Sequence, residues 1–152
     1  MSGRKIVVGI DGTDDSNPAL RWAAAEGELR GVEVEAVHAW AYVPVAAPAD
    51  AGLVPLAWSE SSDVLDASEH AAQLVASEQL TSVLGPDHGV TVTLAQGEPA
   101  AALLAAAEGA DLLVVGNRGR GSLAQALLGS TSAKVSDRAP CPVVVVRSTS
   151  GD

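Results

Sequence analysis

Two segments in the last third of the chain have the residue types that hold phosphate. The first, Gly116–Gly121, follows an apolar run and contains Arg118 and Arg120. The second, Gly129–Ser132, joins one glycine to three hydroxyl side chains at the start of a segment with helical spacing. Glycine lets backbone N–H groups approach an anion without a Cβ atom in the way, and a helix N-terminus adds unpaired donors. Two such segments, about ten residues apart, could bracket a di- or triphosphate.

The distribution of charge is uneven in a way that fits an anion in the same region. The 152 residues include 9 basic and 19 acidic side chains, for a net charge of −10. No Lys or Arg occurs between Gly31 and Asn117, whereas residues 112–147 carry five cations and one carboxylate, a net charge of +4. The overall acidity argues against a nucleic-acid polymer, which needs many basic side chains. It does not argue against one nucleotide, although these cations could also simply flank helix ends.

The composition indicates a protein of the cell interior with an aliphatic core. Hydrophobic residues make up 47% of the chain, but aromatic residues only 3%, and there is no Phe. The single cysteine, Cys141, cannot form an intrachain disulfide, so we expect a reducing cytoplasm. The apolar run before Asp11 is too short for a signal peptide or a membrane helix, so we expect neither export nor a membrane partner.

Strand-like and helix-like segments alternate along the chain. Strands are predicted at residues 4–10, 32–40, 90–94, 111–115 and 142–146, and helices at residues 17–31, 62–84, 99–108 and 122–138. This alternation indicates a parallel sheet with helices on both faces. In such a sheet the ligand lies at the carboxyl ends of the strands, so the strand ends Ile10–Gly12 and Val115–Asn117 are the candidate site. Residues 42–61, rich in Pro and Ala, are predicted to form a long loop.

Two helices carry specific expectations. We expect Asn17 to be the N-cap of the first helix, with Pro18 at its first helical position. The long helix places hydrophobic side chains on one face at helical spacing. These are Leu65, Ala72, Ala76, Leu80 and Val83.

The spacing of the glycines resembles a family signature. Gly116, Gly119, Gly129 and Ser130 match G-x2-G-x9-G-[ST], the pattern of the ATP-binding branch of the universal stress protein family. The similarity extends over nearly the whole chain, through Ile6–Gly12, Val37–Ala39, Gly97–Pro99, Ala110–Gly116 and Ala139–Val146. We therefore expect one doubly wound α/β domain over residues 1–152, with an ordered core of residues 4–147 and a five-stranded parallel sheet in the order 3-2-1-4-5.

The resemblance implies ATP as the ligand, with Mg²⁺ or Mn²⁺ bridging its phosphates. It implies that the Asp11 carboxylate contacts adenosine and that main chain near Gly9 and Ala39 lines the adenine slot. It implies that the ribose and the first phosphates are held by Val115, Gly116, Arg118 and Gly119. It implies that the terminal phosphates are held by Gly129, Ser130 and Thr131. The pair Asn117–Arg118 departs somewhat from the family, in which a small residue followed by His or by another residue is also common. The resemblance also implies a homodimer that pairs through the last strand.

Other interpretations of the same residues stay open. Residues 119–124 fit the dinucleotide pattern G-x-G-x-x-A, but they follow the fourth strand and leave too little sequence for a second nucleotide-binding half. Asp11 could simply cap the following helix, as could the hydroxyls of Ser130–Ser132. His38 fits a hydrogen-bonded histidine of the core.

These observations predict a cytoplasmic, dimeric stress-response protein that binds ATP and signals through its nucleotide state and its partners. The sequence has no Gly-x-Ser-x-Gly elbow and no Ser-His-Asp set, so we expect no catalytic residue. Slow ATP hydrolysis or self-phosphorylation on Ser130 or Thr131 is the most that we expect. A nucleotide-free interaction protein on the same fold and a binder of cyclic nucleotides are the alternatives.

Overall fold

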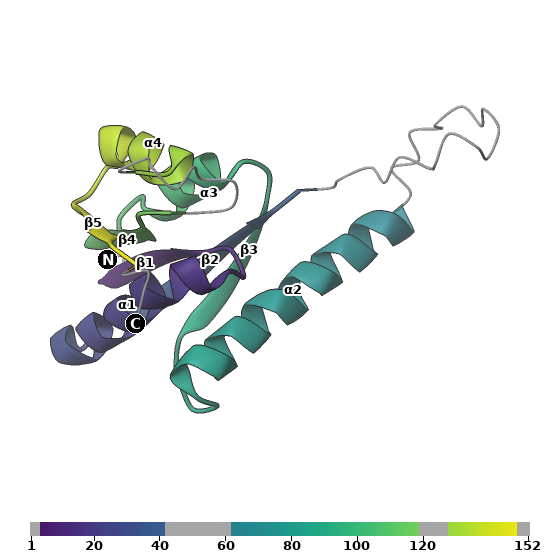
Figure 1. The fold of residues 1–152 in the computed structure, drawn as a ribbon, viewed down its shortest axis with the longest axis horizontal. Helices are drawn as coiled ribbons and strands as arrows, with labels where there is room; N and C mark the ends of the chain where they lie inside the picture. The colour runs from purple at the N-terminus through teal and green to yellow at the C-terminus, as the bar shows by residue number, and fades with distance from the viewer. Residues whose placement is uncertain (1–3, 42–61, 119–127, 149–152) are drawn as a thin grey trace.

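The chain forms an open sheet covered by helices on both faces, seen in the computed structural model, which describes residues 4–41, 62–118 and 128–148 (Figure 1). Its elements in chain order are β1 (Lys5–Ile10), the 3₁₀ turn η1 (Asp14–Ser16), α1 (Asn17–Arg30), β2 (Glu33–Trp40), α2 (Ser62–Leu84), β3 (Thr91–Gln96), α3 (Pro99–Ala106), β4 (Leu112–Gly116), α4 (Ser130–Arg138) and β5 (Val143–Val146).

The five strands are parallel and lie in the order β3-β2-β1-β4-β5. This confirms the expected α/β fold and the expected strand order 3-2-1-4-5. The register pairs Val8 of β1 with Val114 of β4, and Ile10 with His38 of β2. The strand order therefore reverses between β1 and β4, which is where open parallel sheets bind ligands.

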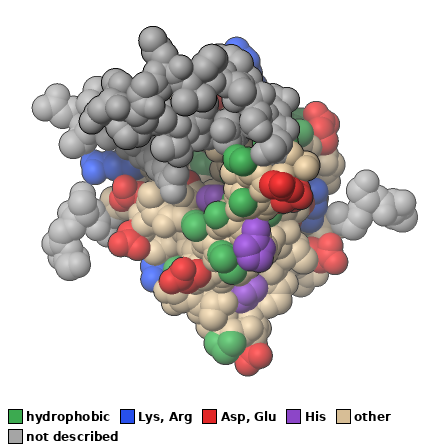
Figure 2. Space-filling model, turned by 90° about the vertical axis from the view of Figure 1, so that its right-hand side faces the viewer, with side chains coloured by type: hydrophobic (Ala, Val, Ile, Leu, Met, Phe, Trp, Pro, Cys, Tyr) green, Lys and Arg blue, Asp and Glu red, His purple; other side chains and the backbone are tan. Residues whose placement is uncertain are grey.

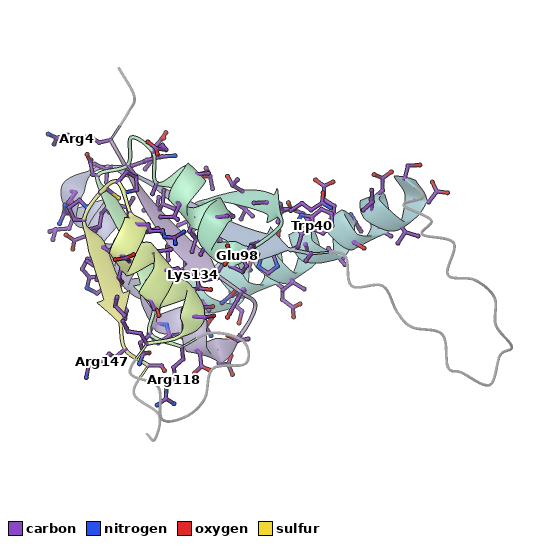
Figure 3. All side chains as sticks on the ribbon, turned by 90° about the horizontal axis from the view of Figure 1, so that it is seen from above. Arg4, Trp40, Glu98, Arg118, Lys134 and Arg147 are labelled. Carbon is purple, nitrogen blue, oxygen red and sulfur yellow. The ribbon has the colours of Figure 1, made fainter. Side chains whose placement is uncertain are left out.

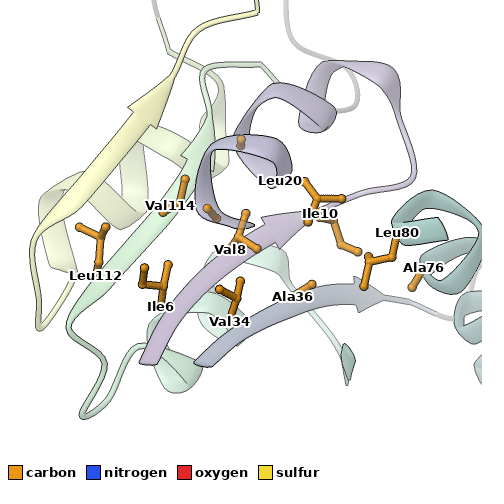
Figure 4. Packing of buried hydrophobic residues seen from close by; sticks show 12 residues of the cluster. Ile6, Val8, Ile10, Leu20, Val34, Ala36, Ala76, Leu80, Leu112 and Val114 are labelled. Carbon is orange, nitrogen blue, oxygen red and sulfur yellow. The ribbon is translucent and has the colours of Figure 1, made fainter. Parts of the chain in front are cut away.

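Side chains that alternate along the central strands build two hydrophobic cores. Ile6, Val8 and Ile10 of β1 point to the face that α1 and α2 cover (Figure 4). Val7 points to the opposite face, where it packs with Leu103 of α3. Full burial of an aliphatic side chain of this size contributes roughly 1.5–3 kcal/mol, so the strands are fixed from both sides.

The start of α1 differs from the prediction by one residue. Ser16 is the N-cap, Asn17 is the first helical residue and Pro18 the second, so the predictions of Asn17 as the N-cap and of Pro18 at the first helical position are both wrong. The reason is the turn η1, which leads the chain directly into the helix. Within it the Ser16 hydroxyl donates to the Thr13 carbonyl at 3.0 Å.

The other element boundaries agree with the sequence to within a few residues. The long helix spans the predicted residues 62–84, and its buried residues include Ala72, Ala76 and Leu80. β3 lies slightly later than predicted, and α3 ends two residues earlier, at Ala106. The predicted loop at 42–61 lies outside the described residues. So does the start of the predicted helix 122–138, of which the described part begins at Ser130.

The N-terminal half of α2 extends beyond the sheet (Figure 1). Hydrophobic side chains are exposed on this helix, with Leu74 at 58% and Val64 at 38%. Figure 2 shows acidic and histidine side chains exposed beside hydrophobic ones on this side of the molecule. None of the helices within the described ranges is both long and apolar enough to cross a membrane.

Candidate functional site

A pocket of about 590 Å³ opens at the carboxyl ends of β1, β2 and β4. Its walls also include residues at the start of α3 and of α4. The volume lies within the range of roughly 300–1,000 Å³ that small-molecule sites occupy. The pocket therefore has the place and the size that a ligand site in this fold requires.

Nine of the ten residues that the sequence singled out line this pocket. They are Gly9, Asp11, Ala39, Val115, Gly116, Arg118, Gly129, Ser130 and Thr131. Gly119 lies outside the described residues. The nine come from segments around β1, β2, β4 and α4 that are far apart in sequence, and the fold brings them to one cavity.

Asp11 begins a tight turn at the end of β1. Its Oδ1 accepts a hydrogen bond from the Thr13 N–H at 2.9 Å and a second from the Thr13 hydroxyl. Gly12 between them has φ +78°, a conformation that glycine adopts without strain. Both bonds use Oδ1, and no other described residue bonds to Oδ2. Asp11 thus shapes its own turn through one carboxylate oxygen and lines the pocket.

Gly116, the first glycine of the motif, has a structural reason for lacking a side chain. A Cβ atom placed there would lie 3.2 Å from the backbone oxygen of Asp15 and 3.4 Å from that of Arg118. The turn after β1 therefore packs directly against the end of β4. The absence of a side chain at Gly116 thus serves the packing of the chain itself, besides the approach of an anion that its sequence context predicts.

Asn117 ties together the elements around the second half of the motif. Its N–H donates to the Val146 carbonyl at 3.0 Å, and its side-chain oxygen accepts from the Ser148 N–H at 3.0 Å. Its carbonyl accepts from the Gly129 N–H at 2.7 Å. Asn117 is 8% exposed. One residue therefore fixes the ends of β4 and β5 and the start of α4, a role that the sequence gave no sign of.

The first turn of α4 offers two hydroxyls to the pocket. Gly129 is the N-cap in extended conformation, and no side chain caps the helix. The Ser132 hydroxyl donates to the Gly129 carbonyl at 3.0 Å, so the fold itself uses this group. The side chains of Ser130 and Thr131 bond to no other described residue. Together with the N–H groups of the first helical turn, they form a donor-rich wall suited to an anion.

An ion pair that the sequence analysis did not predict lies on the pocket wall. Lys134 Nζ donates to Glu98 Oε1 at 2.8 Å, and the two side chains face each other between α4 and α3 (Figure 3). The hydrogen bond from Lys134 holds the pKa of Glu98 below its usual value. Glu98 also caps α3 by accepting from the Ala101 N–H. Lys134 follows Ser130 by one helical turn, and this spacing could have placed both on one face.

Two further residues behave as their sequence context indicated. His38 is 6% exposed, which confirms a buried histidine, and it also lines the pocket with its neighbour Trp40. Partial burial, with the negative charge of Asp111 nearby, raises the pKa of the Cys141 thiol. A thiol with a raised pKa is a poor nucleophile, so Cys141 acts as a small packing residue, in contact with the α3 and α4 core.

Comparison with known proteins identifies the family. The model of the universal stress protein family matches residues 3–147. The chain belongs to the universal stress protein family. A universal stress protein of Thermus aquaticus is 36% identical over 148 residues, which cover 95% of this chain and 98% of that protein. One of Mycolicibacterium smegmatis is 37% identical over 143 residues, or 93% of this chain but only 47% of that longer relative. The chain thus spans about half the length of that protein.

Solved structures of the family share the fold. UspA of Lactobacillus plantarum is 24% identical and superposes with a TM-score of 0.71, covering 97% of this chain and 99% of its own. A universal stress protein in complex with cAMP is 25% identical, with a TM-score of 0.57 and coverage of 96% and 98%. One of Archaeoglobus fulgidus in complex with dAMP is 22% identical, with a TM-score of 0.54 and coverage of 96% and 99%. Nucleotides are therefore found in structural neighbours of this chain.

Proposed function

We propose that this universal stress protein binds ATP in the pocket at the carboxyl ends of β1, β2 and β4. The observation that carries the proposal is that residues from separate segments come together in one cavity. Residues that the motif and the family resemblance single out in four separate segments line one cavity of about 590 Å³. The nucleotides bound by two structural neighbours support the same ligand class.

The two ends of the pocket suit the two ends of a nucleotide. Asp11 and the backbone near Gly9 and Ala39 would contact the nucleoside. The glycines and hydroxyls around Gly129–Thr131, at the N-terminus of α4, would hold the phosphates. Arg118 and Lys134 on the pocket wall would supply positive charge there.

A divalent cation would be held mainly by the nucleotide. Within residues 4–41, 62–118 and 128–148, no three His, Cys, Asp or Glu side chains form a cluster that could hold a metal ion. The Ser130 and Thr131 hydroxyls are oxygen donors of the kind that Mg²⁺ accepts. In our proposal they would add protein ligands to an Mg²⁺ or Mn²⁺ ion that the phosphates bring.

A homodimer through β5 is the second part of the proposal. β5 lies at the edge of the sheet, and its four valines are only partly buried. An edge strand of this kind can pair with another copy of itself. We propose that such a dimer acts in the cytoplasm and that the nucleotide state alters its contacts with protein partners.

The decisive experiment identifies the small molecule that the protein carries. Purified protein is denatured and filtered, and the released molecules are measured by mass spectrometry. The nucleotide-free protein is then titrated by calorimetry with ATP and Mg²⁺. We expect release of an adenine nucleotide and saturable binding of ATP. No nucleotide in the filtrate together with no heat of binding would contradict the proposal.

Cyclic AMP is the competing ligand, and the neighbour in complex with cAMP is the observation that favours it. A single phosphate does not need the Gly129–Thr131 wall. We therefore expect the double variant Ser130→Ala/Thr131→Val to lose affinity for ATP and to keep its affinity for cAMP. If cAMP displaces ATP from the unchanged protein at lower concentration than ATP displaces cAMP, cAMP is the preferred ligand.

A further inference from the structure

A buried glutamine on α2 reaches across to the Asp11 turn. Gln79 is 7% exposed and lies among the core-facing residues of α2, near Ala76 and Leu80. Its side chain makes no bond within its own helix. Among the described residues, its polar atoms contact only a segment more than 60 residues earlier. Oε1 accepts from the Gly12 N–H at 3.0 Å. The two hydrogens of Nε2 are shared among three acceptors, Ser16 Oγ at 2.6 Å, Asn17 Oδ1 at 2.8 Å and Thr13 O at 3.3 Å.

These bonds fix the turn that presents Asp11 to the pocket. Gly12 and Thr13 are the residues directly after Asp11, and Gln79 holds the backbone of both. Ser16, which receives the shortest bond from Gln79, also accepts from the Asp11 N–H at 3.5 Å and lines the pocket. Gln79 thus holds the backbone that directly follows Asp11, although it is not itself part of the described pocket wall.

A polar residue at this place in the core needs a reason. Its neighbours on the buried face are hydrophobic, and a hydrophobic side chain of similar length would fill the same space. A buried amide costs free energy unless its donors and acceptors are matched, and matched bonds bring only a modest net gain. A glutamine at this position is therefore better explained by its role in orienting the turn than by a contribution to the stability of the fold.

We propose that Gln79 is the positioning residue for Asp11, and that it sets the affinity of the pocket for the nucleoside part of its ligand. This inference rests on the proposed function, since it deepens the account of the same site. It assigns to α2 a direct link with the pocket, although α2 contributes no residue to the described pocket wall. The phosphate end, at α4, has no bond to Gln79 and should be unaffected.

The test compares two glutamines of the same helix. Gln79→Met keeps the length of the side chain and removes its hydrogen bonds. Gln73→Met is the matched control, because Gln73 is exposed and bonds only to Ser77. Calorimetry with adenosine and with ATP and Mg²⁺ should show about 10-fold weaker binding of both ligands by Gln79→Met, and no change for Gln73→Met. An unchanged affinity of Gln79→Met overturns the inference.

A double-mutant cycle separates positioning from general damage. If Gln79 acts through Asp11, then Gln79→Met added to Asp11→Ala should weaken adenosine binding by less than twofold further. Fully additive losses overturn the inference and leave the proposed function intact. Absence of adenine-nucleotide binding by the unchanged protein is the distinct outcome that overturns both.

Hydrogen exchange of the ligand-free protein provides a readout that needs no nucleotide. The Gly12 amide donates to Gln79, so it should exchange faster in Gln79→Met than in Gln73→Met. Gln79→Glu keeps the acceptor oxygen for Gly12 and loses the donors, so it should restore the protection of Gly12 in part. Equal exchange of Gly12 in all variants contradicts the proposed positioning, including in a case where Gln79→Met is too unstable for calorimetry.

Discussion

The two ends of the pocket are built in different ways. At the Asp11 end, buried side chains from α2 and η1 hold the backbone through hydrogen bonds, with Gln79 at 7% and Ser16 at 4% exposure. At the α4 end, backbone groups and exposed side chains form the wall, and the ion pair between Lys134 and Glu98 has about half of each side chain in solvent. Buried hydrogen bonds are costly to break, whereas exposed ion pairs contribute little. The Asp11 end should therefore be rigid and sensitive to mutation, and the α4 end adaptable.

The largest effect should come from Ser16→Ala. The change removes an acceptor of Gln79 and the donor to the Thr13 carbonyl inside a buried network. We expect a loss of stability of about 1–3 kcal/mol and binding of adenosine and of ATP that is about 10-fold weaker. Denaturant unfolding and calorimetry measure the two effects.

The matched control is Ser136→Ala, since the Ser136 hydroxyl donates to the Ser132 carbonyl at the exposed side of α4. It should change stability by no more than about 0.5 kcal/mol. If both serine variants lose the same stability, the contrast between a rigid and an adaptable end is wrong.

A smaller and more selective effect is expected for Ser130→Ala. The hydroxyl is exposed and bonds to no other described residue, so its removal should leave the unfolding midpoint unchanged. Binding of ATP should weaken about 3–10-fold, while adenosine binding stays the same, because only the phosphates reach this wall. The exposed Ser82→Ala on α2 serves as control. An equal loss for adenosine would show that the two ends do not act separately.

The smallest effect, and one of opposite sign, is expected for Glu98→Gln. Removing the carboxylate releases Lys134 and lowers the negative charge at the wall, so ATP should bind about 2–3-fold more tightly. Adenosine binding and the unfolding midpoint should not change. The isosteric change keeps a side-chain oxygen that can cap α3. Weaker ATP binding in this variant would contradict the assignment of Lys134 to the phosphate end.

The pH dependence of the same variant follows from the lowered pKa of Glu98, for which Lys134 is the main cause. A carboxylate with a lowered pKa in the folded state keeps its ion pair above its usual value of 4.5 and loses it as the pH falls through the folded value. The difference in ATP affinity between Glu98→Gln and the unchanged protein should be constant from about pH 6 to pH 8 and should vanish in acid. A difference that grows below pH 5 would be inconsistent with this ion pair.

Sequence patterns predicted much of the fold and many residues of the site, because both depend on the order and spacing of residues along the chain. Alternating strands and helices fix a parallel sheet, since parallel strands need crossovers. The glycine and serine spacing located Gly116, Gly129 and Ser130 of the cavity wall, and the family resemblance that it revealed pointed to the other six described residues. The prediction of the α1 N-cap was wrong by one residue because η1 leads directly into the helix, so that Asn17 is already helical. The hydrogen bond from the Ser16 hydroxyl to the Thr13 carbonyl stabilises this turn.

Hydrophobic periodicity could not identify the residues that join distant segments. It selects Ala72, Ala76 and Leu80 on α2 and passes over Gln79, because a polar residue on a buried face looks like an interruption of the pattern. Asn117 was located at a strand end of the candidate site, but nothing in the local sequence indicates that it connects β4, β5 and α4. Such residues are defined by partners elsewhere in the chain.

The sequence alone determined the class of fold, the family resemblance and the residue types of a phosphate-binding motif, because each of these depends on order and spacing along the chain. The tertiary structure decided which groups lie together. It placed Gln79 against the Asp11 turn, Glu98 against Lys134, and the Asp15 carbonyl where a side chain of Gly116 would be. These contacts join residues from 36 to 101 positions apart, and only the packing of helices on both faces of one sheet brings them next to each other.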